Sequence, residues 1–338
     1  MSTVPLLRYV IAGTLRRNYI ITHKGEALLN VPGGSLLYAG AGAAVWESGI
    51  GLVGRAGEDY PHDWLADVAD RGMDLRGIHV LPEAVDLRFF MAHLDGGGKT
   101  TDNPVSHFAR LGLPYPKSLL GYVPPAPMID SKTRPGLLTL RQNDVPDDYL
   151  DATAAHLCPL DFLSHTLLPS VLRQGQINTI TLDPGASYMN PTFWDDIPVL
   201  LNGLNAFLCS EEKVTSLFQG RSTDLWEMAE ALAGYGCEMV VIKRGSHGQY
   251  LYNGASHAKW IIPAYPIEVM DPTGAGDAFC GGFLAGYRST YDPLQATLTG
   301  NISAAMTIEG SHPFYALDAL PGLAKARLES LQETVRKV

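Results

Sequence analysis

The residues best suited to chemistry lie in one short stretch, VMDPTGAGDAF at 269–279. An apolar segment ends there at an acid and a proline, a glycine-rich turn follows, and small and apolar residues continue over 278–287. This order predicts a loop that leads into a buried helix. The first N–H groups of a helix lack partners inside the helix and carry partial positive charge. At Gly274, Ala275 and Gly276 little or no side chain covers them, so the stretch is predicted to bind an anion.

Asp277 directly follows these three residues. Its negative charge beside a predicted anion site requires a chemical explanation. It would repel the anion, unless it accepts the proton of a hydroxyl that attacks the anion. Phosphoryl transfer to an alcohol needs this pairing of a general base with bare amides. A simpler interpretation is that Asp277 only complements the helix dipole after a glycine-rich turn.

The motif DPTGAGDAF as a whole resembles the signature of the ribokinase-like (PfkB) carbohydrate kinases. The resemblance implies that Asp277 is the general base and that the amides of 274–277 hold the transferring phosphoryl group. It implies an ATP-dependent kinase that moves the γ-phosphoryl group to a hydroxyl of a sugar, sugar acid or nucleoside. ATP and Mg²⁺ are the implied cofactors, and Asp271 matches a family position linked to a monovalent cation such as K⁺.

The elements that position these residues follow from apolar periodicity. From about Leu157 strands and helices alternate regularly, which predicts a mainly parallel sheet covered on both faces. A βαβ-like unit is predicted over 50–78, and a hairpin over 19–31. Longer apolar or amphipathic segments predict helices at 193–204 and 323–338.

The family resemblance supplies the rest of the expected architecture. It implies one ribokinase-like domain over 1–338, built as a three-layer α/β/α sandwich with a mainly parallel central sheet. A small β lid is expected from about 14–34 and 84–100. Members of the family often dimerise through their lids, so a homodimer of that kind is a further expectation.

Four residues near the N-terminus are candidate ligands of a sugar-like acceptor. Gly33 and Gly34 match the glycine pair that opens the first helix beside the sugar, where absent side chains let backbone amides approach hydroxyls. This chain has Asn18 where the family usually has an acidic residue, and Tyr38 where it usually has an asparagine. Both side chains can hydrogen-bond a polyol.

Arg16 and Arg17 lie beside Asn18, and two interpretations are open. Guanidinium groups near the acceptor favour one that carries a carboxylate or phosphate. Alternatively, both arginines are solvated residues of the lid.

Candidate nucleotide ligands lie further along the chain. Lys243 and Gly245 belong to KRGSHG, at the end of a predicted strand, where the family has a turn beside the nucleotide phosphates. A lysine at this position is seen in relatives that phosphorylate sugar acids, although a solvated lysine is also common. Asn301 lies on a segment that resembles the adenine-side helix of the family.

Asp183, Glu212 and Asp271 are the candidate metal ligands. Asp183 follows a predicted strand, and ligands of open α/β sheets collect at such ends, although a turn-forming role explains it equally. Glu212 lies in Ser210-Glu-Glu-Lys213, where the family shows Asn-x-x-Glu, a motif tied to magnesium and phosphate. It either holds a magnesium-bound water or is a first-turn acid of a helix.

Bulk properties limit the alternatives. The net charge of −10 over 338 residues argues against nucleic-acid or membrane-surface partners. No apolar run has membrane-spanning length. The four cysteines are far apart in apolar surroundings, which suits buried thiols of a cytoplasmic protein.

Two other classes of function are weighed against a kinase. One is a non-catalytic sugar or nucleotide sensor on a kinase fold, because several family positions differ here. The other is a nicotinamide oxidoreductase, which depends on the glycines of 40–45. That stretch lacks the third glycine of a dinucleotide fingerprint, so close helix packing explains it better.

Overall fold

The computed structural model describes residues 6–94, 98–124 and 130–337. Its main sheet has ten strands in the order β14-β13-β12-β11-β10-β9-β8-β1-β4-β5. The strands from β11 to β5 are parallel, and β12, β13 and β14 are antiparallel additions at one edge. Their bounds are β1 Tyr9–Ala12, β4 Ile50–Gly57, β5 Asp74–Leu81, β8 Ala154–Leu157, β9 Thr179–Leu182, β10 Ala206–Ser210, β11 Met239–Lys243, β12 Gln249–Asn253, β13 Ala258–Ile262 and β14 Arg336–Lys337.

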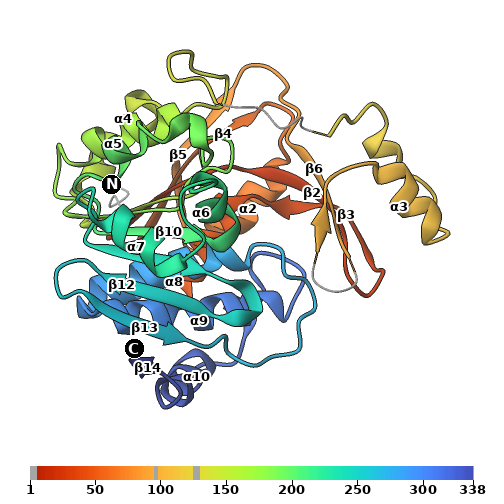
Figure 1. Ribbon diagram of the computed structural model, residues 1–338. Coiled ribbons are helices and arrows are strands. Elements are labelled where there is room, and N and C mark those ends of the chain that lie inside the picture. The colour runs from red at the N-terminus through yellow and green to blue at the C-terminus, as the bar shows by residue number, and fades with distance from the viewer. Residues whose placement is uncertain (1–5, 95–97, 125–129, 338) are drawn as a thin grey trace.

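Helices cover both faces of this sheet, because alternate strand residues are apolar on each side (Figure 1). One face carries α1 (Ser35–Ala44), α2 (His62–Asp70), α8 (Ala275–Thr290) and α9 (Pro293–Ile308), with α10 (Leu323–Gln332) beside α9. The other carries α4 (Phe162–Leu172), α5 (Ile197–Leu201), α6 (Glu211–Leu217) and α7 (Leu225–Ala233). The three-layer α/β/α prediction is confirmed.

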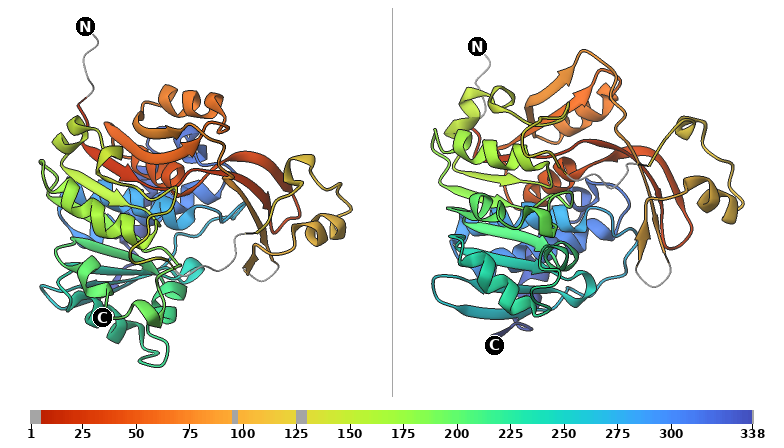
Figure 2. Two further views of the ribbon diagram at one scale, coloured as in Figure 1. Left: turned by 90° about the horizontal axis from the view of Figure 1, so that it is seen from above. Right: turned by 45° about the horizontal axis from the view of Figure 1, so that its top comes forward.

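A second sheet forms the predicted lid and projects from the body (Figures 1 and 2). Its order is β3-β2-β6-β7, with bounds β2 Arg16–Ile21, β3 Ala27–Gly33, β6 Arg88–His93 and β7 Lys99–Thr100. Residues 95–97 of the predicted lid lie outside the described residues.

The apolar outer face of the lid is covered by the chain itself. Helix α3 (Pro104–Arg110) and the following segment supply Phe108 and Leu119, which pack into one buried cluster with lid residues of β2 and β6. Local sequence analysis leaves 106–146 irregular, because its described parts are held by distant contacts: Phe108 and Leu119 pack on the lid, whereas Leu140 packs in the core of the main sheet.

Two predicted helices end earlier than expected. The segment 323–338 is a helix only to Gln332, and its end forms β14, which pairs with the edge strand β13. Unpaired edge groups of β13 favour this pairing, which local periodicity does not reveal. The predicted helix at 193–204 is shortened at both ends to the five-residue α5, with Pro198 in its first turn, and Phe193 belongs to a preceding 3-10 turn.

Helices α1 and α8 pack backbone to backbone. A Cβ atom at Gly42 would lie 2.2 Å from the Ala278 carbonyl oxygen, and one at Gly281 would lie 1.9 Å from that of Ala39. Of the glycines in 40–45, Gly42 is therefore the one that allows close helix packing. This contact sets the position of α8, whose first turn carries Asp277.

The structure also bears on the cysteines and on membrane-spanning helices. Cys158, Cys209, Cys237 and Cys280 are buried free thiols. Within the described residues, none of the helices combines the length and apolar character needed to cross a bilayer.

Candidate active site

Strand alternation brings several polar residues to the α8 face of the sheet. Leu182 of β9 and Ile242 of β11 pack toward the opposite helices, so the residues that follow them, Asp183 and Lys243, face α8. Both lie at the carboxyl edge of parallel strands, where open α/β sheets bind ligands. Asp277 lies above this edge, in the first turn of α8.

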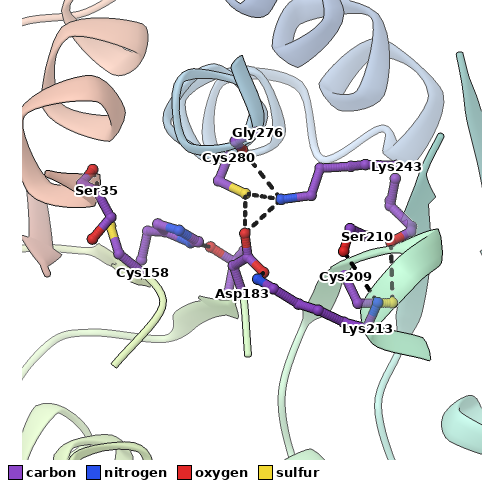
Figure 3. Close-up of polar contacts among 12 residues, drawn as sticks. Ser35, Cys158, Asp183, Cys209, Ser210, Lys213, Lys243, Gly276 and Cys280 are labelled. Carbon is purple, nitrogen blue, oxygen red and sulfur yellow. Dashed lines mark hydrogen bonds and ion pairs between the residues drawn. The ribbon is translucent and has the colours of Figure 1, made fainter. Parts of the chain in front are cut away.

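Asp183 is held between two lysines (Figure 3). The Nζ atoms of Lys213 and Lys243 lie 2.7 and 2.6 Å from its two carboxylate oxygens. Burial raises the pKa of Asp183, but the two ammonium groups outweigh this and lower it to about 2. Lys243 also donates to the Gly276 carbonyl at 3.1 Å. The cluster therefore places positive charge next to the glycine-rich turn.

Three backbone amides of that turn are free. Gly274 has a left-handed φ of 79°, and the turn ends in the N-terminus of α8. Within the described chain, the N–H groups of Gly274, Gly276 and Asp277 donate no hydrogen bond, while that of Ala275 donates to the Pro272 carbonyl at 3.3 Å. Uncompensated amides at a helix N-terminus are suited to bind an anion.

The Asp277 carboxyl is half-buried beside these amides. Burial is the main reason that its pKa rises to about 6, and the negative charge of Asp183 adds to the rise. Lys243, Lys213 and Arg16 oppose it. A carboxylate with a pKa just below neutral is suited to accept a proton at neutral pH.

The predicted acceptor residues meet at the other side of the turn. Asn18 packs directly on Gly33, where a Cβ atom would lie 2.0 Å from the Asn18 side-chain nitrogen. The ring of Tyr38 packs on Gly274, where a Cβ atom would lie 2.1 Å from it. Gly34 is the N-cap of α1 and brings Tyr38 to this place. The Asn18 side-chain oxygen is buried without a hydrogen-bond partner among the described residues.

Burial raises the pKa of the Tyr38 hydroxyl, with further contributions from the negative charges of Asp271 and Asp277. The hydroxyl therefore stays protonated and can donate a hydrogen bond.

The candidate metal ligands are not brought together. Both oxygens of Asp183 are occupied by lysines, and Glu212 is exposed on α6. Among the described residues, no group of three or more His, Cys, Asp or Glu side chains has a geometry that could hold a metal ion. These side chains therefore do not fit a magnesium ion bound by protein carboxylates.

Asp271 lies at the base of the turn and is buried. One of its oxygens accepts the Thr273 N–H at 3.0 Å and lies 3.3 Å from the Nε2 atom of His93. The other oxygen is buried with no partner among the described groups. His93 comes from the lid strand β6, so the lid touches the turn here. No local signal in the sequence connects these residues.

The nucleotide candidates have different surroundings. Lys243 lies beside Gly276, as described above, and Gly245 begins the short turn that follows β11. Asn301 is buried, and its amide donates to Gln249 and to the Pro263 carbonyl, both at 2.8 Å. Its side-chain oxygen accepts the Tyr265 N–H at 3.0 Å. Asn301 thus anchors the segment before the turn, and both its side-chain nitrogen and its side-chain oxygen are hydrogen-bonded within the chain.

In the sequence, Lys213 is recognisable only as the residue that replaces the glutamate of the family motif Asn-x-x-Glu. Its ion pair with Asp183 depends on the adjacency of β9 and β10. A correct prediction that β9 and β10 are neighbours would have placed Lys213 near Asp183.

Known proteins similar in sequence to this chain are kinases, as the geometry of the site suggests. The model of the pfkB family carbohydrate kinases matches residues 166–318. A cytidine kinase of Thermococcus kodakarensis is 28% identical over 287 residues, which are 83% of this chain and 89% of the relative. An uncharacterized sugar kinase of Archaeoglobus fulgidus is 32% identical over 40% of this chain, a match that spans about half (51%) of the relative.

Solved structures show the same fold. A putative ribokinase II from E. coli, in complex with ATP and Mg²⁺, matches with a TM-score of 0.69 at 18% identity, over 97% of this chain and 100% of that chain. A nucleoside kinase of Burkholderia thailandensis in complex with inosine matches with a TM-score of 0.69 at 17% identity, over 96% and 97% of the two chains.

A parallel α/β/α sandwich with a β lid beside a glycine-rich helix N-terminus defines a ribokinase-like fold. Residues 166–318 thus match the pfkB family carbohydrate kinases, and the relative that matches most of the chain is itself a kinase, which supports the same class of enzyme here.

Proposed function

We propose that the chain transfers the γ-phosphoryl group of ATP to a hydroxyl of a sugar, sugar acid or nucleoside. The observation that carries this proposal is the half-buried Asp277 carboxyl, with its raised pKa, beside three free backbone amides. Asp277 accepts the proton of the acceptor hydroxyl. The free amides of Gly274, Gly276 and Asp277 stabilise the negative charge on the transferring group, and Ala275, whose own amide donates to the Pro272 carbonyl, keeps the turn free of a bulky side chain.

The two lysines are proposed to contact the nucleotide phosphates. Lys243 already donates to Asp183, to the Gly276 carbonyl and to the Cys280 sulfur, so it fixes positive charge beside the amides. Lys213 donates only to Asp183 among the described side chains, which leaves two of its N–H groups for a phosphate. The E. coli ribokinase II complex contains Mg²⁺ together with ATP. Magnesium would here enter with the nucleotide, and no step above depends on it.

A monovalent cation is proposed at Asp271. Its buried, unpartnered oxygen fits a cation, because a buried carboxylate oxygen without a donor is costly. Comparing turnover in KCl with turnover in choline chloride tests the site, and equal rates would remove the proposal.

The whole chain 1–338 is proposed to act as one kinase unit, with the lid closing over the acceptor and excluding water. A homodimer through the lid would have to use the edges of the lid strands, because helix α3 and Leu119 already cover its outer apolar face. Light scattering at assay concentrations measures whether any dimer forms.

The proposed reaction is tested by ADP release from ATP in the presence of sugars, sugar acids and nucleosides. A kinase releases ADP well above the rate with water alone for at least one acceptor class. A sensor would bind an acceptor, detected by calorimetry, without ADP release. The kinases among the relatives give the sensor alternative no support.

The rate should depend on pH through Asp277. The base is active only as a carboxylate, and its pKa is about 6. We therefore expect kcat/KM to be nearly constant above this pKa and to fall about tenfold per pH unit below it. Rates between roughly pH 5 and 8, with folding checked by circular dichroism at each pH, measure this. A flat profile over that range would contradict the assignment of the base.

A further inference from the structure

Arg16 on lid strand β2 carries a guanidinium group that forms no ion pair and no hydrogen bond within the described part of the chain. Its one recorded contact is the Phe89 ring, with the guanidinium carbon 3.9 Å from the ring centroid. The side chain is half-buried. Arginine stays protonated in proteins, so this is a partly desolvated positive charge with all five N–H donors unused.

Two other lid arginines show the contrast. Arg17 donates to the Asn30 side chain at 3.0 Å and lies 3.5 Å from an Asp59 oxygen. Arg88 pairs with Asp86 at 2.8 Å. Both guanidinium groups are therefore neutralised within the chain. Among these three lid arginines, Arg16 alone lacks a neutralising partner. Because it is half-buried against Phe89, it is not a freely solvated lid residue.

Strand alternation gives Arg16 its direction. On β2, Tyr19 and Ile21 pack on the outer face of the lid, so Arg16 and Asn18 share the inner face. Asn18 packs on Gly33 in the acceptor region. The charges of Arg16 and Asp277 act on each other, as expected for groups that face one site.

We propose that Arg16 binds an anionic group of the acceptor, so that the preferred substrate is a polyol carrying a carboxylate or a phosphate. The inference rests on the proposed kinase function and deepens it. A guanidinium fork matches two oxygens of either anion, and stacking on Phe89 holds its plane while leaving the N–H edge free. The acceptor's anionic end would lie at Arg16 and a hydroxyl at Asp277.

The test compares matched acceptors in the ADP-release assay: aldonic acids, sugar phosphates, the corresponding neutral sugars, and cytidine. The unmodified enzyme should use an anionic acceptor with kcat/KM at least about tenfold above that of its neutral counterpart. Arg16→Gln should lose roughly 10- to 100-fold with the anionic acceptor and change by less than about threefold with the neutral one. Comparing carboxylate with phosphate acceptors identifies the anion.

Arg17→Gln is the matched control, because it removes the same charge from the next residue, on the outer face of the lid. It should shift both acceptor classes by less than about threefold. Unchanged ATP affinity in calorimetry verifies that Arg16→Gln is folded. Arg16→Lys, which keeps the charge but loses the fork, should recover part of the selectivity.

The proposal is overturned if the unmodified enzyme prefers neutral sugars or cytidine. It is also overturned if Arg16→Gln lowers both acceptor classes equally. If no acceptor releases ADP, the kinase proposal fails separately. Thermal shift then decides on Arg16 alone, because anionic polyols should stabilise the unmodified protein and not Arg16→Gln, and equal shifts would contradict the inference.

Discussion

Asp277→Asn should lower kcat by roughly 10²- to 10⁴-fold and leave the affinity for ATP almost unchanged. Asparagine has nearly the same shape as aspartate but cannot accept a proton at neutral pH. The free amides of Gly274 and Gly276 and the lysines near Asp183 are untouched by the change. The loss therefore falls on the chemical step, because nucleotide binding uses other groups.

Single-turnover and steady-state ADP release measure kcat, and calorimetry measures ATP binding. Asp292→Asn is a suitable control, because it removes the same charge from an exposed residue that caps the next helix, where asparagine caps equally well. Residual activity of Asp277→Asn should also lose the fall below a pH of about 6 that Asp277 causes. Turnover close to that of the unmodified enzyme would show that Asp277 is not the base.

Gly42→Ala should destabilise the protein by about 3 kcal/mol, while Gly40→Ala in the same helix should change its stability by less than about 1 kcal/mol. The new methyl at position 42 would lie 2.2 Å from the backbone oxygen of Ala278, so α1 and α8 must separate. The methyl at position 40 would meet only the ends of the Leu52 and Met73 side chains, at 3.2 Å, and these can move. Alanine's better helix propensity offsets part of that smaller cost.

Urea unfolding followed by circular dichroism measures both variants under one protocol. Gly42→Ala should also reduce kcat at temperatures where it remains folded, because α8 carries Asp277 and the free amides. Gly40→Ala should keep its activity. Equal destabilisation by the two substitutions would mean that the contact between the helix backbones does not determine the position of α8.

Some features of this enzyme are readable from neighbouring residues. The turn and helix of 271–287 follow from glycine, proline and apolar order, and the parallel sheet follows from regular alternation of strands and helices. The glycines at 40–45 predict close helix packing, which Gly42 makes against Ala278. Each of these depends on backbone freedom or periodicity within a few residues of the chain.

Other parts of the candidate site depend on residues far apart in the sequence. The sequence suggests Asp183 as a metal ligand or a turn former, but the order of β9, β10 and β11 encloses it between Lys213 and Lys243. Asn301 resembles an adenine-side residue, yet its amide is used to anchor the segment before the turn. Such pairings depend on strand order, which residue types do not reveal.

The amino-acid sequence by itself determined the glycine-rich helix start at 274–277 and the layered parallel architecture, because these depend on local spacing and periodicity, and the resemblance of DPTGAGDAF to a kinase signature indicated the class of reaction. Only the tertiary structure decided which charges are already paired. It left Arg16 without an ion pair or a hydrogen bond among the described residues while neutralising Arg17, and it covered the lid with the chain's own helix α3. The physical reason is that electrostatic pairing and burial depend on distances in space, and the fold brings together residues separated by tens to hundreds of positions.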